Sequence, residues 1–165
     1  MSSRLNDSCG NVVLGVVQSR AIRLSLNDYR DCAEAIFSAL LDESGSVLME
    51  SGTMPPEQSA TLGALANGAF IAVRELGRRL GDEACEGLYH QGGTRHFHIA
   101  PLSPTTFLFT VFGNDTKFGI IRSALAKYGP TLREKMQMAE RETSSIGSTS
   151  VGDLVLAPSD GTAVA

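Results

Sequence analysis

The sequence contains no run of about 18 or more consecutive apolar residues, the length that a membrane-spanning helix needs. Its first ten residues also lack the basic and apolar regions of a secretory signal peptide. Only three cysteines are present, Cys9, Cys32 and Cys85, and their wide spacing fits neither a disulfide framework nor a CxxC pair. We therefore expect a cytoplasmic protein with no membrane insertion and with reduced, structural thiols.

An excess of basic residues is absent as well. The formal net charge is -4 at pH 7, so no global positive field attracts phosphates, and nucleic acid is not an expected partner. Apolar residues make up 42% of the 165 residues and charged residues 19%, which excludes a wholly disordered, collagen-like or coiled-coil chain. The composition indicates one globular domain with a tail, and a protein or a small molecule as its partner.

The motifs that mark common enzyme active sites are missing too. Neither GxxxxGKS/T nor GxGxxG occurs. Gly147 and Gly152 have P-loop spacing, but Asp153 and Leu154 follow where Lys and Ser or Thr are needed to hold phosphate and magnesium. No GxSxG elbow is present, and paired carboxylates such as Asp42-Glu43 lie in turns. We expect no catalytic residues, no cofactor and no enzymatic activity of the chain itself.

Three histidines are the candidates for a metal site. His96 and His98 are two residues apart, which places both rings on one face of a strand, and His90 lies in the preceding strand-like segment. Three imidazoles can in principle meet a metal, but no Cys or carboxylate with ligand spacing accompanies them. We favour ordinary polar residues on the exposed face of a half-buried strand, and we predict no metal site.

Hydrophobic patterning predicts a helix and then a hairpin in the first third of the chain. The apolar residues at 12–17 fit a strand or an early helix. Asn27 and Asp28 are good N-caps, so the first helix is expected to begin there. Alternating apolar residues on both sides of a turn at 42–45 predict the hairpin. Its strands are expected at 36–41 and 46–51.

The second helix carries the most informative pattern. It is predicted to run from Pro55-Pro56-Glu57 to Leu80-Gly81, where Gly81 ends it. One face repeats apolar residues at steps of three and four and is predicted to face the core: Leu62, Leu65, Ala66, Ala69, Val73, Leu76 and Leu80. The opposite side carries small residues and an exposed Ile where charge is expected, which indicates a contact surface, although scattered surface apolar residues are common. This predicted surface consists of Ala64, Asn67, Gly68, Ile71, Glu75 and Arg78.

Three further strands and a third helix complete the pattern. The strands are expected at 87–91, 95–100 and 105–112. Both faces of the last strand are mostly apolar, as in a central strand, so helices must flank the sheet on both faces. The third helix is expected at 116–128, with an interruption at Gly129-Pro130 and a continuation to 142.

The order of these elements resembles the roadblock/dynein-light-chain family. The hairpin at 39–48, with an Asp-x-x-Gly turn between aliphatic strands, and the second helix at 62–81 are similar to the family's corresponding elements. The stretches 89–92 and 111–122 are similar to bacterial members of the MglB type, whereas Ala66-Asn67-Gly68 stands where those members tend to have Ala-Gly-Asn. The resemblance covers 27–142. It leaves an N-terminal segment of uncertain structure, 1–26, and a flexible tail, 143–165, in which only 151–156 is expected to dock.

The resemblance implies both a fold and a function. The fold is an α/β sandwich of the profilin-like kind, a five-stranded, mostly antiparallel sheet with helices on both faces. It implies a homodimer that pairs through an edge strand, here Arg95, His96, Phe97, His98, Ile99 and Ala100, with the second helices meeting across the two-fold axis. Those helices would receive a Ras-like small GTPase in bacterial polarity or motility signalling and promote its GTP hydrolysis without an arginine finger. The alternative is a scaffold that binds a protein and leaves nucleotide turnover unchanged.

Overall fold

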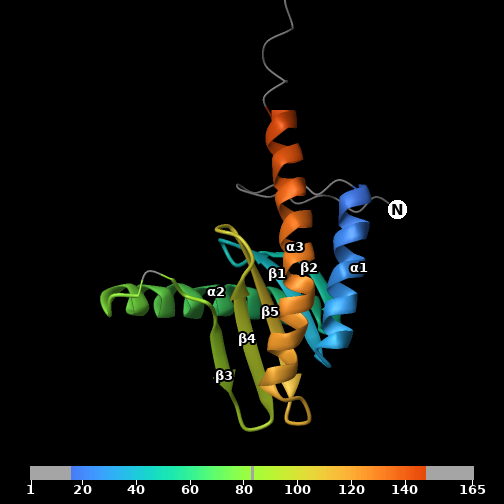
Figure 1. The fold of residues 1–165 in the computed structure, drawn as a ribbon. Helices are drawn as coiled ribbons and strands as arrows, with labels where there is room; N and C mark the ends of the chain where they lie inside the picture. Colours follow the sequence, from blue (N-terminus) through green and yellow to red (C-terminus); the bar gives the residue numbers. More distant parts are fainter. Residues whose placement is uncertain (1–15, 83, 148–165) are drawn as a thin grey trace, which may run out of the picture.

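The computed structural model describes residues 16–82 and 84–147. These residues form three helices around a single sheet, in the order helix, hairpin, helix, three strands, helix, which confirms the expected fold class (Figure 1). The elements are α1 (Val16–Cys32), β1 (Phe37–Asp42), β2 (Val47–Gly52), α2 (Pro56–Arg79), β3 (Leu88–Gln91), β4 (Arg95–Pro101), β5 (Thr106–Gly113) and α3 (Phe118–Gly147).

The sheet has five strands in the order β2-β1-β5-β4-β3, and every neighbouring pair is antiparallel. β5 is the central strand, as its two apolar faces predicted. β4 lies between β5 and β3, so the prediction of an open edge at Arg95–Ala100 was wrong. The short strand β3 covers that edge, because its four residues pair with β4 from Leu88 opposite Ile99 to Gln91 opposite His96.

The first helix begins at Val16, well before the expected start at Asn27 and Asp28. Its buried stripe includes Ile22, Leu26 and Tyr29, so tertiary packing already selects a helical face upstream of the supposed N-caps. The side chain of Asn27 is used differently from a cap, because its Oδ1 accepts a hydrogen bond of 2.6 Å from the Ser51 hydroxyl on β2. The N-cap pattern was therefore a misleading local signal.

The third helix runs without interruption from Phe118 to Gly147, so the expected break at Gly129-Pro130 and the end at 142 were wrong. Pro130 has no N–H to donate to Ala126 one turn earlier. Both of these residues are exposed, so solvent is at hand for the carbonyl that lacks its amide partner. Leu132 and Met136, in the turns that follow, are fully buried, and their packing holds the helix on the sheet beyond the proline.

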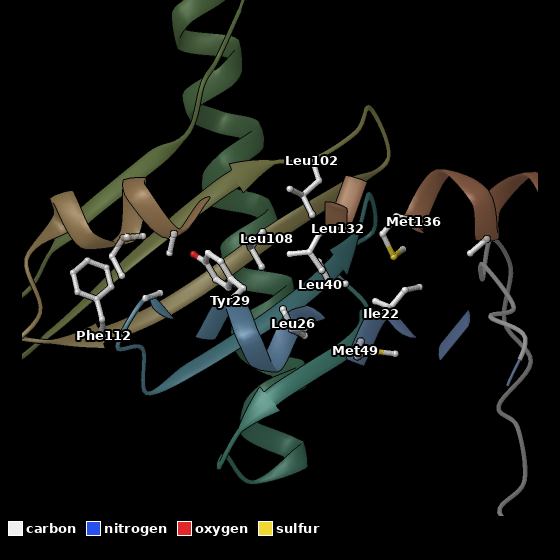
Figure 2. Packing of buried hydrophobic residues seen from close by; sticks show 14 residues of the cluster. Ile22, Leu26, Tyr29, Leu40, Met49, Leu102, Leu108, Phe112, Leu132 and Met136 are labelled. Atoms are coloured by element: carbon white, nitrogen blue, oxygen red, sulfur yellow. The ribbon is translucent and has the colours of Figure 1, made fainter. Parts of the chain in front are cut away.

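Helices α1 and α3 lie side by side on one face of the sheet (Figure 1). Figure 2 shows the core that they form with the strands, in which side chains of both helices meet Leu40 of β1 and Leu108 of β5. At its centre the Tyr29 hydroxyl and the Thr110 hydroxyl are 2.8 Å apart and hydrogen-bonded. The fully buried members include Ile22, Leu26, Tyr29, Leu40, Phe112, Ile121, Leu132 and Met136.

Helix α2 covers the opposite face of the sheet and forms a second, smaller core. Phe70 packs its ring 5.0 Å from that of Phe107, and Ala66 is buried beside it. The turn between β1 and β2 also approaches the helix very closely. A Cβ at position 63 would lie 2.5 Å from the carbonyl oxygen of Gly45, so only glycine fits there.

Candidate functional site

Helix α2 has the bounds that its sequence signals predicted. It begins at Pro56 after Pro55 and ends at Arg79, and Gly81 follows with φ +95. The amide of Gly81 bonds the Arg78 carbonyl at 3.2 Å, and the amide of Asp82 bonds the Gly77 carbonyl at 2.9 Å. This pair of bonds is a Schellman motif, which needs a residue in the left-handed region at position 81.

The rotation of α2 about its axis differs from the prediction. Three leucines assigned to the core face are exposed: Leu65 at 65%, Leu76 at 58% and Leu80 at 76%. The side that packs against the sheet consists of Ser59, Gly63, Ala66, Asn67 and Phe70. The hairpin turn approaches α2 so closely that only small residues fit at the contact. The helix therefore turns its small residues toward the sheet and leaves the leucine stripe exposed.

The predicted contact surface is placed mostly as expected, with one correction. Ala64, Gly68, Ile71 and Arg78 are exposed, and Glu75 is half-buried. Asn67, in contrast, is buried, and its Nδ2 donates a hydrogen bond of 2.9 Å to the Glu43 carbonyl in the hairpin turn. Asn67 therefore fastens the helix to the sheet and is not available to a partner.

Four aliphatic side chains of α2 are exposed, Leu65, Leu76 and Leu80 on one side of the helix and Ile71 on another, and together we call them the α2 apolar surface. No α2 residue after Phe70 is buried, and in Figure 1 the C-terminal turns of α2 extend past β3, beyond the outline of the sheet. An aliphatic surface on a projecting helix is the usual mark of a protein-protein contact. Sequence reasoning found Ile71 but missed the three leucines, because it assigned their periodic stripe to the core.

The charges of this region sit at the end of the helix. Glu75 pairs with Arg78 and with Arg79, each at 2.8 Å. Hydrogen bonds from Arg78 and then Arg79 lower the pKa of the Glu75 carboxyl. One carboxylate thus binds two guanidinium groups at this end of the helix.

A groove of about 390 Å³ lies beside the N-terminal half of α2, on the same face of the sheet. Its apolar lining includes Leu62 of α2, Phe97 of β4 and Val111 of β5. His90 of the edge strand stacks on Phe97, with 4.7 Å between ring centroids. Sequence reasoning did not identify this groove, although Phe97 and Val111 are directly paired across β4 and β5.

The three histidines do not converge. In the β3–β4 register His90 is opposite Phe97, whereas Tyr89 is opposite His98 and Gln91 opposite His96, so His90 lies on the other face of the sheet. His96 and His98 are also buried, which corrects the exposed position assigned to them. His96 Nε2 lies 2.6 Å from Asn114 Oδ1. Within residues 16–82 and 84–147, no group of three or more His, Cys, Asp or Glu side chains is arranged to hold a metal.

The architecture, a five-stranded antiparallel sheet between α2 and an α1–α3 layer, is the roadblock fold. Myxococcus xanthus MglB matches with a TM-score of 0.70 at 19% identity, over 77% of this chain and 96% of that one. The gliding protein mglB of Thermus thermophilus matches with a TM-score of 0.70 at 21% identity, over 76% and 96%. A Roadblock/LC7 domain from Streptomyces avermitilis matches with a TM-score of 0.55 at 17% identity, over 77% and 98%. At such identities the likeness establishes the fold.

No protein-family model and no curated protein matches the chain. In the described part of the sequence, no helix has both the length and the apolar character needed to cross a membrane.

Proposed function

We propose that this protein is a homodimeric regulator of a Ras-like small GTPase in bacterial polarity or motility, acting in the cytoplasm. The observation that carries the proposal is the α2 apolar surface, which a single chain leaves exposed. The structural likeness to MglB supports it, as does the resemblance of 89–92 and 111–122 to MglB-type sequences.

The regulator works through contacts and contributes no catalytic group of its own. At the end of the helix the Glu75 carboxylate is already bound to two arginines, Arg78 and Arg79. A surface of this kind changes GTP hydrolysis by binding one arrangement of the GTPase switch loops more tightly than another. The partner's own residues then carry out the chemistry.

A second copy of the chain would cover the part of the α2 face that a single chain leaves exposed. β3 is an edge strand, so its outer backbone groups are free to pair with another strand. If two copies pair through β3, the projecting half of each α2 lies over the sheet of the other copy, on the face that carries the groove. One MglB structure is described in a tetrameric arrangement. Size-exclusion chromatography with light scattering should give twice 17.5 kDa at micromolar concentration, and a monomer would contradict the dimer.

The direct test uses the Ras-like GTPase encoded in the same genome. Single-turnover GTP hydrolysis should accelerate when the full chain is added, and the GTP-bound partner should co-elute with it. Substituting Ile71→Asp places a charge in the α2 apolar surface and should weaken binding at least about 30-fold, the loss typical of a central interface residue. Unchanged affinity for this variant would remove the surface from the proposal.

A matched control is Leu24→Asp on α1, a position that is similarly exposed on the other side of the sheet. This variant should bind the GTPase as the unmodified chain does, and circular dichroism should be the same for both variants. If a complex forms but GTP hydrolysis is not accelerated, the protein is a scaffold and not an activator.

A further inference from the structure

A cavity of about 490 Å³ lies between α3 and the edge strand β3, on the face of the sheet opposite α2. No residue of the α2 apolar surface lines it, although Glu86 and Gly87 at its rim also line the hollow beside Ile71. The volume of the cavity is within the range of small-molecule binding pockets, roughly 300–1,000 Å³. The residues that matter for its chemistry are Glu86, Tyr89, His98, Phe118, Arg122 and Ala126.

The inner wall of the cavity is a buried histidine. His98 is only 6% exposed, and its ring makes no hydrogen bond with the residues that the structure describes. Gly87 runs directly alongside it: a Cβ at that position would lie 2.9 Å from His98 Nε2. Gly87 also has φ +156, a backbone conformation that favours glycine. Gly87 and His98 both line the cavity.

Protonation of His98 is disfavoured in this position. Burial, and then the positive charge of Arg122, lower the pKa of His98 to about 4. At neutral pH the ring is therefore uncharged and offers one N–H donor and one acceptor.

The side of the cavity is aromatic and rigid. The rings of Tyr89 and Phe118 are stacked, with 4.2 Å between centroids and 7° between planes. His98 meets Phe118 edge-on at 5.1 Å, which fixes the histidine against the same wall. A flat apolar group of a ligand can pack against these rings with little loss of side-chain entropy.

Arg122 supplies the one positive charge of the cavity. It lies on α3 and is exposed, and within the described residues its guanidinium makes no hydrogen bond or ion pair. Guanidinium groups bind carboxylates in a planar, two-pronged geometry. Glu86 lines the same cavity, so a doubly charged phosphate meets more repulsion there than a singly charged carboxylate does.

We propose that this cavity binds a small aromatic carboxylic acid, with the carboxylate held by Arg122 and His98 and the ring packed against Tyr89 and Phe118. The polar groups lie against an aromatic wall, and this combination matches a molecule with an anionic end and a flat apolar body. The site uses no residue of the α2 apolar surface. Its test therefore needs no GTPase.

The test is a titration of the ¹⁵N-labelled full chain with sodium phenylacetate, followed by two-dimensional NMR, and a parallel titration with the neutral analogue phenylacetamide. Saturable shifts should be confined to the amides around 86–89, 98 and 118–126. Phenylacetamide should bind about tenfold more weakly, as expected for the loss of a charge-assisted hydrogen bond. No GTPase is present, so failure here leaves the proposed function unaffected.

Two exposed positions on α3 give variants whose folding is not at risk. Arg122→Gln should weaken phenylacetate binding about tenfold and leave phenylacetamide unchanged, and Ala126→Phe should block both by filling the cavity. Arg141→Gln is the matched control, on the same helix roughly 28 Å away, and should bind normally. Equal shifts with acid and amide, full binding by Arg122→Gln, or no saturable shifts would each overturn the proposal.

Discussion

The two faces of the sheet are covered to very different degrees. Under α1 and α3, the side chains of Tyr29, Phe112 and Leu132 are fully buried. Under α2, burial stops at Phe70, and Phe97 and Val111 of the sheet stay half-buried beside a groove. A single chain buries the large side chains at the centre of one face, and the other face leaves aliphatic groups exposed. The difference separates the face that holds the larger core from the face that carries the proposed contact surface.

The largest expected effect comes from a change in the face under α1 and α3. Phe112→Ala removes a fully buried ring and should lower the free energy of unfolding by about 4 kcal/mol, the usual cost of a cavity of this size. Chemical denaturation followed by circular dichroism measures it. A loss below about 1 kcal/mol would mean that this core is much looser than its burial implies.

The next largest effect is a pH dependence of the free energy of unfolding, which arises from His98 on the same face of the sheet. Folding lowers the pKa of His98 from 6.5 to about 4, so the unfolded chain binds the proton first and the native state loses stability as pH falls through this window. Above pH 6.5 the contribution is constant, and by pH 4 the loss should approach about 3 kcal/mol. The charge that acts on the ring is that of Arg122, and Glu86 and Tyr89 line the same cavity.

The measurement is the free energy of unfolding between pH 7 and pH 4, compared with a His98→Gln variant that cannot titrate at this position. The variant should lose less stability over the window, and the difference isolates His98 from the carboxylates. Parallel curves for His98→Gln and the unmodified chain would contradict the assignment.

A smaller effect is expected from the hydrogen bond inside the face under α1 and α3. Tyr29→Phe leaves the buried Thr110 hydroxyl without its partner and should cost about 1 to 2 kcal/mol. Burial also raises the pKa of Tyr29 to about 12, so its phenol should stay protonated when exposed tyrosines ionise, which ultraviolet titration detects. Tyr89→Phe is the matched control, because its hydroxyl makes no hydrogen bond with the described residues and its loss should change stability little.

The smallest effect on stability is expected on the α2 face. Leu76→Ser changes an exposed side chain, so the free energy of unfolding at high dilution should move by less than about 0.5 kcal/mol. Self-association measured by light scattering should weaken in the same variant. A large loss of stability in the monomer would show that Leu76 is part of the core after all, and the contrast between the faces would fail.

Much of the fold was predictable because its signals are local. The hairpin follows from alternation around the turn at 42–45, α2 follows from Pro56 and Gly81, and the central position of β5 follows from its two apolar faces. Errors arose where a local signal competed with packing. Asn27 has the chemistry of an N-cap but lies within α1, and Pro130 has the chemistry of a helix breaker but lies within α3.

The candidate site was predicted only in part, because its local signals do not show how the helix packs. Periodicity identified α2 as the helix with an unusual surface and singled out Ile71, but it cannot distinguish an aliphatic stripe that faces the core from one that faces a partner. The strand pattern likewise placed His96 and His98 on one face, without revealing that α3 covers that face. The cavity beside Arg122 joins residues of β3, β4 and α3, so no spacing along the chain predicts it.

The sequence by itself determined the kinds of elements, their order and most of their bounds, because turn chemistry and hydrophobic period act over a few residues. The tertiary structure decided which side of α2 is buried, which strand forms the edge, and which polar side chains share a cavity. Those outcomes depend on how closely two backbones can approach, as at Gly63 and Gly45, and such contacts join residues that are distant along the chain.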